Sequence, residues 1–116
     1  MEGMELTCFQ IISFTGTARS IYIEAIEEAK KGNIEKAKQM IKEGEDAFNQ
    51  GHEIHAKMIQ EEANGKSIEV PILLVHAEDQ LMSAEDFGIL AEEFITTLKQ
   101  IYDLKHQIGE NAHETK

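Results

Sequence analysis

The sequence predicts an all-α protein, folded as a single antiparallel three-helix bundle over residues 1–116. It contains one proline and no tryptophan. It is rich in alanine, isoleucine, leucine, glutamate, lysine and glutamine, which lose little rotamer freedom in a helix or pack well along its apolar stripe. Apolar residues recur at steps of three and four along three long stretches, the period of an amphipathic helix. At 116 residues the chain has the size of one domain with one modest core.

The first helix is expected over residues 5–31, where apolar side chains recur on one face. A glycine inside a helix costs about 1 kcal/mol relative to alanine, so Gly16 marks either a bend or a close contact between helices. The run from Lys30 to Asn33 combines cationic residues with residues that tolerate left-handed backbone, which is a stop signal. A short loop should follow.

The second helix is expected over residues 34–63, with the same apolar period. The tripeptide Asn49-Gln50-Gly51 is a turn signal that would split this stretch, but the period continues across it and favours one long helix. Asn64-Gly65 should end the helix, and a loop follows.

The third helix is expected over residues 71–108, with Pro71 in its first turn, where a missing N–H costs no hydrogen bond. The segment from Ser83 to Asp86 resembles a weak capping box that would restart a helix, but the apolar register across it is unbroken. The tail Gly109–Lys116 lacks the pattern and is expected to be frayed.

The charge of the chain excludes several classes of partner. Aspartate and glutamate number 22 against 11 lysines and arginines, so the formal net charge is −11, and nucleic acid or an anionic lipid surface would be repelled.

No stretch approaches the roughly 18 apolar residues of a membrane span, and the first residues lack the basic region of a secretory signal. Cys8 is the only cysteine, which rules out an intrachain disulfide. We therefore expect a cytoplasmic protein in which Cys8 is a buried structural thiol.

The stretch Pro71–Ser83 places polar residues inside an apolar run. His76 and Gln80 are four residues apart and His76 and Asp79 three, so all three share one side of a helix. On spacing alone, His76 is either part of a site or a hydrogen-bonded interior or interface histidine with Asp79 beside it. Wide apolar stripes leave a face for self-association. Asp79 near a symmetry axis would then bring like charges together, which demands proton sharing or a cation.

A second group of polar residues lies on the second expected helix. His52 and His55 are three residues apart, a spacing that can hold a metal, and Glu53 and Glu62 are near in sequence. Two histidines are half of a zinc shell, and no HExxH motif is present. Surface or interface histidines are therefore favoured over a metal-dependent enzyme built on His52, His55 and Glu62.

Three segments together match a known pattern: Gly16-Thr17-Ala18-Arg19-Ser20, His52 to Gly65, and Leu73-Leu74-Val75-His76-Ala77-Glu78-Asp79-Gln80-Leu81-Met82. With these segments and the order of its helices, nearly the whole chain resembles the lactose/cellobiose-specific enzyme IIA family of the bacterial sugar phosphotransferase system. The last segment is the specific one.

This resemblance implies a phosphocarrier. The family histidine that matches His76 accepts a phosphoryl group from phosphohistidine on the carrier HPr and passes it to a cysteine of enzyme IIB, for uptake of a β-linked disaccharide. The resemblance also implies a homotrimer, with His76 in a cleft between subunits. Asp79 of each subunit would then face a divalent cation such as Mg²⁺, and the chain would meet the membrane only through the permease component.

The chemistry of the residues fits this role. An imidazole with the reference pKa of about 6.5 is a competent neutral nucleophile near pH 7. The transferring phosphoryl group spreads charge over three oxygens, so Gln80, one turn after His76, is a candidate donor that orients it, aided by the dipole of the early helical turns. The family often has glutamine where Glu78 stands and histidine where Gln80 stands. Glu78 would repel a phosphorylated His76 unless it points away, so it is left out of the site.

Two questions stay open from sequence. The sugar is not identified, and lactose, cellobiose, chitobiose and related β-linked disaccharides all fit. The alternative function is a non-catalytic helical-bundle interaction module, which would bind a partner through its helices without taking up phosphate.

Overall fold

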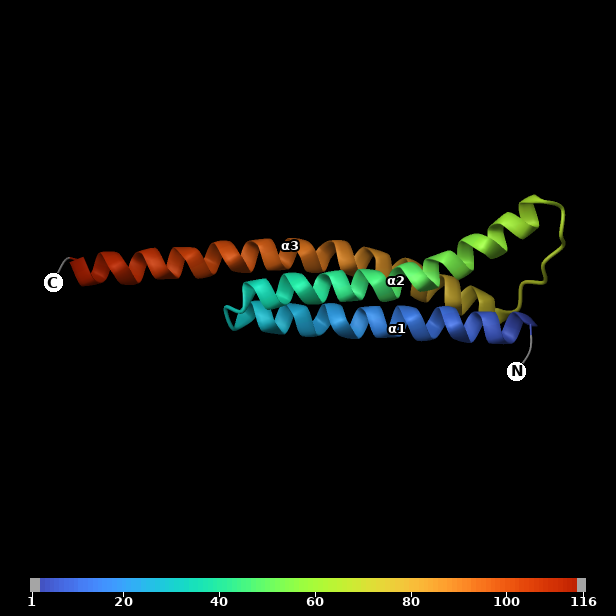
Figure 1. The fold of residues 1–116 in the computed structure, drawn as a ribbon, viewed down its shortest axis with the longest axis horizontal. Coiled ribbons are helices and arrows are strands. Elements are labelled where there is room, and N and C mark those ends of the chain that lie inside the picture. The colour runs from blue at the N-terminus through green and yellow to red at the C-terminus, as the bar shows by residue number, and fades with distance from the viewer. Residues whose placement is uncertain (1–2, 115–116) are drawn as a thin grey trace.

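The computed structural model describes residues 3–114, which form three α-helices and the two connections between them. Helix α1 spans Gly3–Lys30, α2 spans Ile34–Ala63 and α3 spans Ile72–Glu114. Helix α2 runs antiparallel to the other two in an elongated rod of 73 × 25 × 20 Å (Figure 1). The predicted all-α class and the three-helix bundle are confirmed. Among these helices, none combines the length and the low polarity that a membrane span requires.

The turns that end α1 and α2 each contain a glycine with left-handed backbone. Gly32 has φ +90°, and its N–H donates to the Ala29 carbonyl at 3.0 Å while the next N–H donates to the Glu28 carbonyl at 3.0 Å. Gly65, with φ +95°, repeats this pair of bonds after α2. This is the Schellman arrangement, in which glycine avoids the steric cost of a side chain. The stops predicted at these glycines are confirmed, and the bounds of α2 agree with the prediction.

Helix α3 extends further than the sequence predicts. It continues to Glu114, so the frayed tail expected over Gly109–Lys116 is wrong up to that residue; Thr115 and Lys116 lie outside the described residues. The reason is that one glycine costs only about 1 kcal/mol in a helix, and no proline follows to stop it. Every residue from 101 to 110 is exposed, and this end of α3 overhangs the other two helices (Figure 1).

The three interruptions that the sequence left open are absent from these helices. Helix α1 is unbroken at Gly16, α2 at Gly51 and α3 between Ser83 and Asp86. Gly51 is buried, and a Cβ placed there would lie 3.3 Å from the Cβ of Phe14, so this glycine serves a close approach of α1 and α2. Gly16 is exposed, and a Cβ placed there would meet no atom within 4 Å, so it makes no such contact.

The ring of Tyr22 fills the centre of the bundle. Tyr22 is 2% exposed and projects from α1 between Gly44 of α2 and Gly88 of α3. A Cβ on Gly44 would lie 2.5 Å from Cε1 of this ring, and one on Gly88 would lie 2.9 Å from Cε2. The two glycines therefore make the room that the ring occupies. Burial raises the pKa of the Tyr22 hydroxyl to about 12, assisted by the carboxylates of Glu45 and Glu92.

The outward face of α3 carries an exposed apolar stripe. Its members follow one another at steps of three and four residues, with Asp79, Asp86 and Thr97 standing within the row. The single chain leaves these apolar side chains between 44% and 88% exposed, namely Ile72, Val75, Met82, Leu90, Phe94, Ile101, Leu104 and Ile108. A surface of this kind suits association with another copy or partner.

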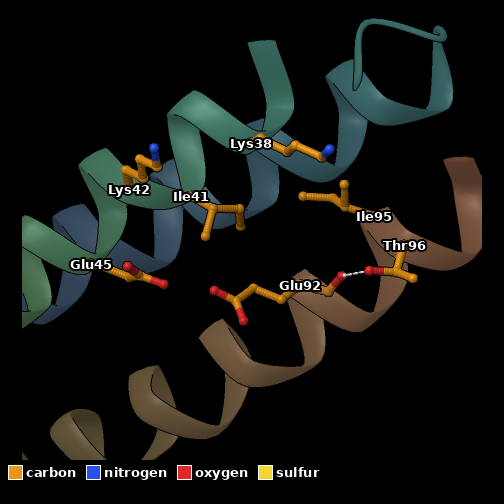
Figure 2. A pocket seen from close by; sticks show the side chains of 7 residues that line it. All are labelled: Lys38, Ile41, Lys42, Glu45, Glu92, Ile95 and Thr96. Atoms are coloured by element: carbon orange, nitrogen blue, oxygen red, sulfur yellow. Dashed lines mark hydrogen bonds between the residues drawn. The ribbon is translucent and has the colours of Figure 1, made fainter. Parts of the chain in front are cut away.

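A hollow of about 340 Å³ lies between α2 and α3, away from the start of α3. In Figure 2 the carboxyl groups of Glu45 and Glu92 point toward each other across it, while the ammonium groups of Lys38 and Lys42 point away. The facing carboxyl group of Glu92, which can share a proton with Glu45, raises the pKa of Glu45, and burial and the charges of Glu92 and Asp46 act in the same direction. The Lys42 charge opposes this rise.

Replacing Gly44 by alanine should destabilise the bundle. The new Cβ would meet the Tyr22 ring, which Gly88 blocks from behind, and overpacking of this kind costs about 1–3 kcal/mol. The matched control is Gly16→Ala, which meets no atom and should raise the free energy of unfolding by about 0.5–1 kcal/mol. Urea titrations of both variants measure this. Equal stabilisation by the two alanines would contradict the packing described.

Replacing Glu45 by glutamine should change how stability depends on pH. The folded state holds a proton between the Glu45 and Glu92 carboxyl groups more tightly than the unfolded chain holds a proton on Glu45. The stabilisation that this shared proton gives is complete below the ordinary pKa of 4.5 and is lost as the pH rises through the raised pKa. Glu45→Gln should therefore raise the free energy of unfolding near neutral pH, with the gain shrinking toward pH 4.5. Urea titrations across this range test it. The exposed Glu43, changed to glutamine, is the control, and identical pH profiles for the two variants would exclude the shared proton.

Candidate functional site

The candidate site residues lie in the first turns of α3. Pro71 precedes the helix, and its carbonyl accepts the N–H of Leu74 at 3.0 Å, which fixes where the first turn begins. His76 and Asp79 are exposed, and Gln80 is half-buried. Because His76 and Gln80 are four residues apart in an unbroken helix, they lie one above the other on the same face. The structure thus brings together two of the predicted residues, with His76 at the surface.

Glu78 faces a different element. Its Oε2 lies 2.8 Å from Nε2 of His55 on α2, and both side chains are partly buried. Two residues along a helix correspond to a rotation of about 200°, so Glu78 projects from the side of α3 opposite His76. The carboxylate that would repel a phosphoryl group on His76 is therefore turned toward α2.

Gln80 has a partner on α1 that spacing alone did not indicate. Nη1 of Arg19 donates to Oε1 of Gln80 at 2.7 Å. The two residues are 61 positions apart, and only the packing of α1 against α3 brings them together. Arg19 belongs to one of the segments that carried the family resemblance, which was the one sequence signal available for it.

Asp79 stands within the apolar stripe of α3, between Val75 and Met82. These two neighbours are 56% and 69% exposed. Asp79 itself takes part in none of the ion pairs among residues 3–114. A charged carboxylate in an apolar surface is costly to cover unless a cation or proton accompanies it. Carboxylate oxygen is also the ligand that Mg²⁺ prefers, so the residue fits the predicted metal role.

The histidines of α2 do not gather into a metal site. His52 is exposed and packs against the ring of Phe48, with 5.9 Å between ring centroids. His55 is bound to Glu78, and these two residues line a second hollow, of about 110 Å³, which Glu62 also lines. Within the described residues of one chain, no three histidine, cysteine, aspartate or glutamate side chains are placed to hold a metal ion. The arrangement offers no support for the metal-dependent enzyme.

Cys8 is buried in the part of the core that lies near the starts of α1 and α3. Burial, and then the charge of Glu78, raise the pKa of its thiol, which keeps the reactive thiolate scarce. The expectation of a structural thiol is in line with this placement.

Comparison with known proteins identifies the family. The family model described as "PTS system, Lactose/Cellobiose specific IIA subunit" matches residues 6–99. The lichenan-specific phosphotransferase enzyme IIA component of Bacillus subtilis is 37% identical over 100 residues, which cover 86% of this chain and 91% of that protein.

Solved structures agree. The PTS cellobiose specific enzyme IIA from Bacillus anthracis has a TM-score of 0.85 and 37% identity, covering 89% of this chain and 94% of that one. The IIA(Chitobiose) structure from a complex with HPr of the Escherichia coli phosphotransferase system has a TM-score of 0.77 and 29% identity, covering 88% of this chain and 99% of that one. The chain therefore belongs to the lactose/cellobiose-specific IIA family and is a component of a phosphotransferase system, as the resemblance predicted.

Proposed function

We propose that this protein is the phosphocarrier of a sugar phosphotransferase system, with His76 as the residue that carries the phosphoryl group. The main observation behind this proposal is that His76 is exposed and takes part in none of the side-chain hydrogen bonds found within residues 3–114. A relay residue must be reached by two different proteins in turn, and such a placement allows this. Family membership and the HPr complex of a relative support HPr as the donor.

The transfer exchanges one nitrogen–phosphorus bond for another. The ring nitrogen of His76 that holds a lone pair attacks the phosphorus of phosphohistidine on HPr. As the new bond forms, the old one breaks and the donor imidazole recovers its lone pair. Enzyme IIB would take the group in the second step, when its cysteine thiolate attacks the same phosphorus and His76 regains its lone pair. Both steps need positioned donors more than further covalent chemistry.

Gln80 supplies such donors. Its carboxamide carries two N–H groups one turn from His76, close enough for an amide of this length to meet a phosphoryl oxygen on the imidazole. Since Glu78 is bound to His55 on α2, no carboxylate from its position competes with the phosphoryl group for these donors.

The apolar stripe of α3 supports assembly as a homotrimer. Three copies that met along this stripe would cover its exposed side chains and bring the three Asp79 carboxylates together. A divalent cation such as Mg²⁺ would be held there by one Asp79 from each subunit, and it would offset their mutual repulsion. Its role would be structural and separate from the transfer at His76.

The relatives differ in the sugar that their names give: lichenan, cellobiose and diacetylchitobiose. We therefore infer the substrate class, a β-linked disaccharide or related oligosaccharide, and a cytoplasmic place of action where HPr and enzyme IIB meet the chain. The sugar itself would be selected by the permease component.

Loss of the imidazole should abolish phosphate uptake. After incubation with phosphoenolpyruvate, enzyme I and HPr, the wild-type protein should gain one acid-labile phosphoryl group per chain, visible as an intact-mass shift. His76→Gln should gain none, because a carboxamide has no nucleophilic lone pair of comparable strength.

The control is His52→Gln, which removes another exposed histidine and should label normally. Normal labelling of the His76 variant would refute the assignment of His76. A wild-type protein that stays unlabelled beside an active relay would favour the interaction module instead.

Removing the charge of Asp79 should free assembly from its dependence on a cation. In sedimentation equilibrium the wild-type protein should be a trimer that chelation with EDTA weakens, because three unshielded carboxylates then repel one another. Asp79→Asn should remain associated with or without EDTA. Glu85→Gln, an exposed neighbour outside the stripe, should behave as wild type. Sedimentation of the wild type as a monomer, or a trimer indifferent to EDTA, would contradict this arrangement.

A further inference from the structure

The contact between Arg19 and Gln80 constrains the Gln80 carboxamide, which lies one helical turn from His76. A guanidinium group donates hydrogen bonds and accepts none, so the Gln80 atom 2.7 Å from Nη1 has to be the carbonyl oxygen. The amide nitrogen of Gln80 is therefore directed away from Arg19. Both of its N–H donors stay available, and no hydrogen bond within the described residues uses them.

The environment of Arg19 strengthens its hydrogen bond to Gln80. Arg19 is half-buried, its Nε is buried without a hydrogen-bond partner, and it forms none of the ion pairs within residues 3–114. A positive charge with so little compensation strengthens its remaining hydrogen bond, since charge-assisted bonds are about twice as strong as neutral ones. A donor on the carbonyl oxygen also polarises an amide and makes its N–H groups better donors.

We propose that Arg19 is a positioning residue for phosphoryl transfer, which acts by fixing the Gln80 carboxamide so that its N–H groups meet the phosphoryl oxygens on His76. This rests on the proposed function. Without Arg19, the carboxamide would rotate and present its oxygen, an acceptor that repels phosphate, for part of the time. The buried Nε of Arg19 has no hydrogen-bond partner, which lowers the stability of the fold. A role in holding the site geometry would explain why arginine stands at this position.

The test measures single-turnover transfer from phospho-HPr to the full-length protein. Arg19→Gln should slow transfer at saturating phospho-HPr by about tenfold, the effect of roughly one charge-assisted hydrogen bond. The phospho-HPr concentration that gives half the maximal rate should stay within about twofold of wild type, because the proposed role of Arg19 acts through Gln80 and not through binding of the donor protein. Arg19→Lys, which keeps a cationic donor, should recover part of the rate.

A double-mutant cycle separates positioning from a general structural effect. In a Gln80→Met background the further change Arg19→Gln should alter the rate less than about twofold, because the group that Arg19 holds is gone. Lys30→Gln, which removes another cation from α1 where it pairs with Glu27 at the surface, should transfer at the wild-type rate. Circular dichroism and sedimentation confirm that each variant is folded and assembled as wild type.

Three results would overturn the proposal: wild-type transfer by Arg19→Gln, the same slowing by Arg19→Gln with and without Gln80, or slowing that appears only as weaker donor binding. Failure of the proposed function has a different signature, because the wild-type chain itself would then take up no phosphoryl group on His76.

Discussion

The rotation of α3 about its own axis is the constraint on which the rest of the structure depends, and Tyr22 sets it. The ring can enter the centre of the bundle only where Gly44 and Gly88 leave room, so α3 must turn Gly88 inward. That choice places Ala77, Leu81 and Ala84 of the same helix in the core. Since neighbouring positions on a helix are about 100° apart, the outward directions of the residues between them are then fixed as well.

One helix thereby presents three different surfaces within a few residues. Glu78 is turned to α2 and Gln80 to α1, while Asp79 is left in the outward stripe. His76, one helical turn before Gln80, is exposed to solvent. A phosphoryl relay and an assembly surface can therefore occupy one short segment without sharing side chains, which is how His76 and Asp79 separate into two proposed sites.

The features that were predictable from sequence are those that depend on residues near one another in the chain. The three helices follow from apolar period, and the ends of α1 and α2 follow from Gly32 and Gly65, where left-handed backbone is needed. The end of α3 was not predictable in this way, because the apolar period stops at Ile108 while the single Gly109 does not end the helix. His76 and Gln80 could be placed on one face by their spacing. Their exposure depends on how the bundle packs.

Contacts between helices account for what the sequence did not indicate. Spacing relates residues within a helix, so it linked Gln80 to His76 but not to Arg19, which lies 61 positions away. The partner of Glu78 on α2 is hidden for the same reason. The family resemblance named the segments that contain these residues, and only the packed bundle gives the atoms that meet.

The overhang of α3 also separates the two ends of the molecule in a useful way. At 1.5 Å per residue, the helix carries the described chain about 57 Å from His76 to Glu114. A fluorophore or an immobilising tag attached at Lys105 would stand toward the far end of the rod from the relay histidine. Such a handle would leave the surface where HPr and enzyme IIB are proposed to dock free, so both partners could be followed on the same tethered protein.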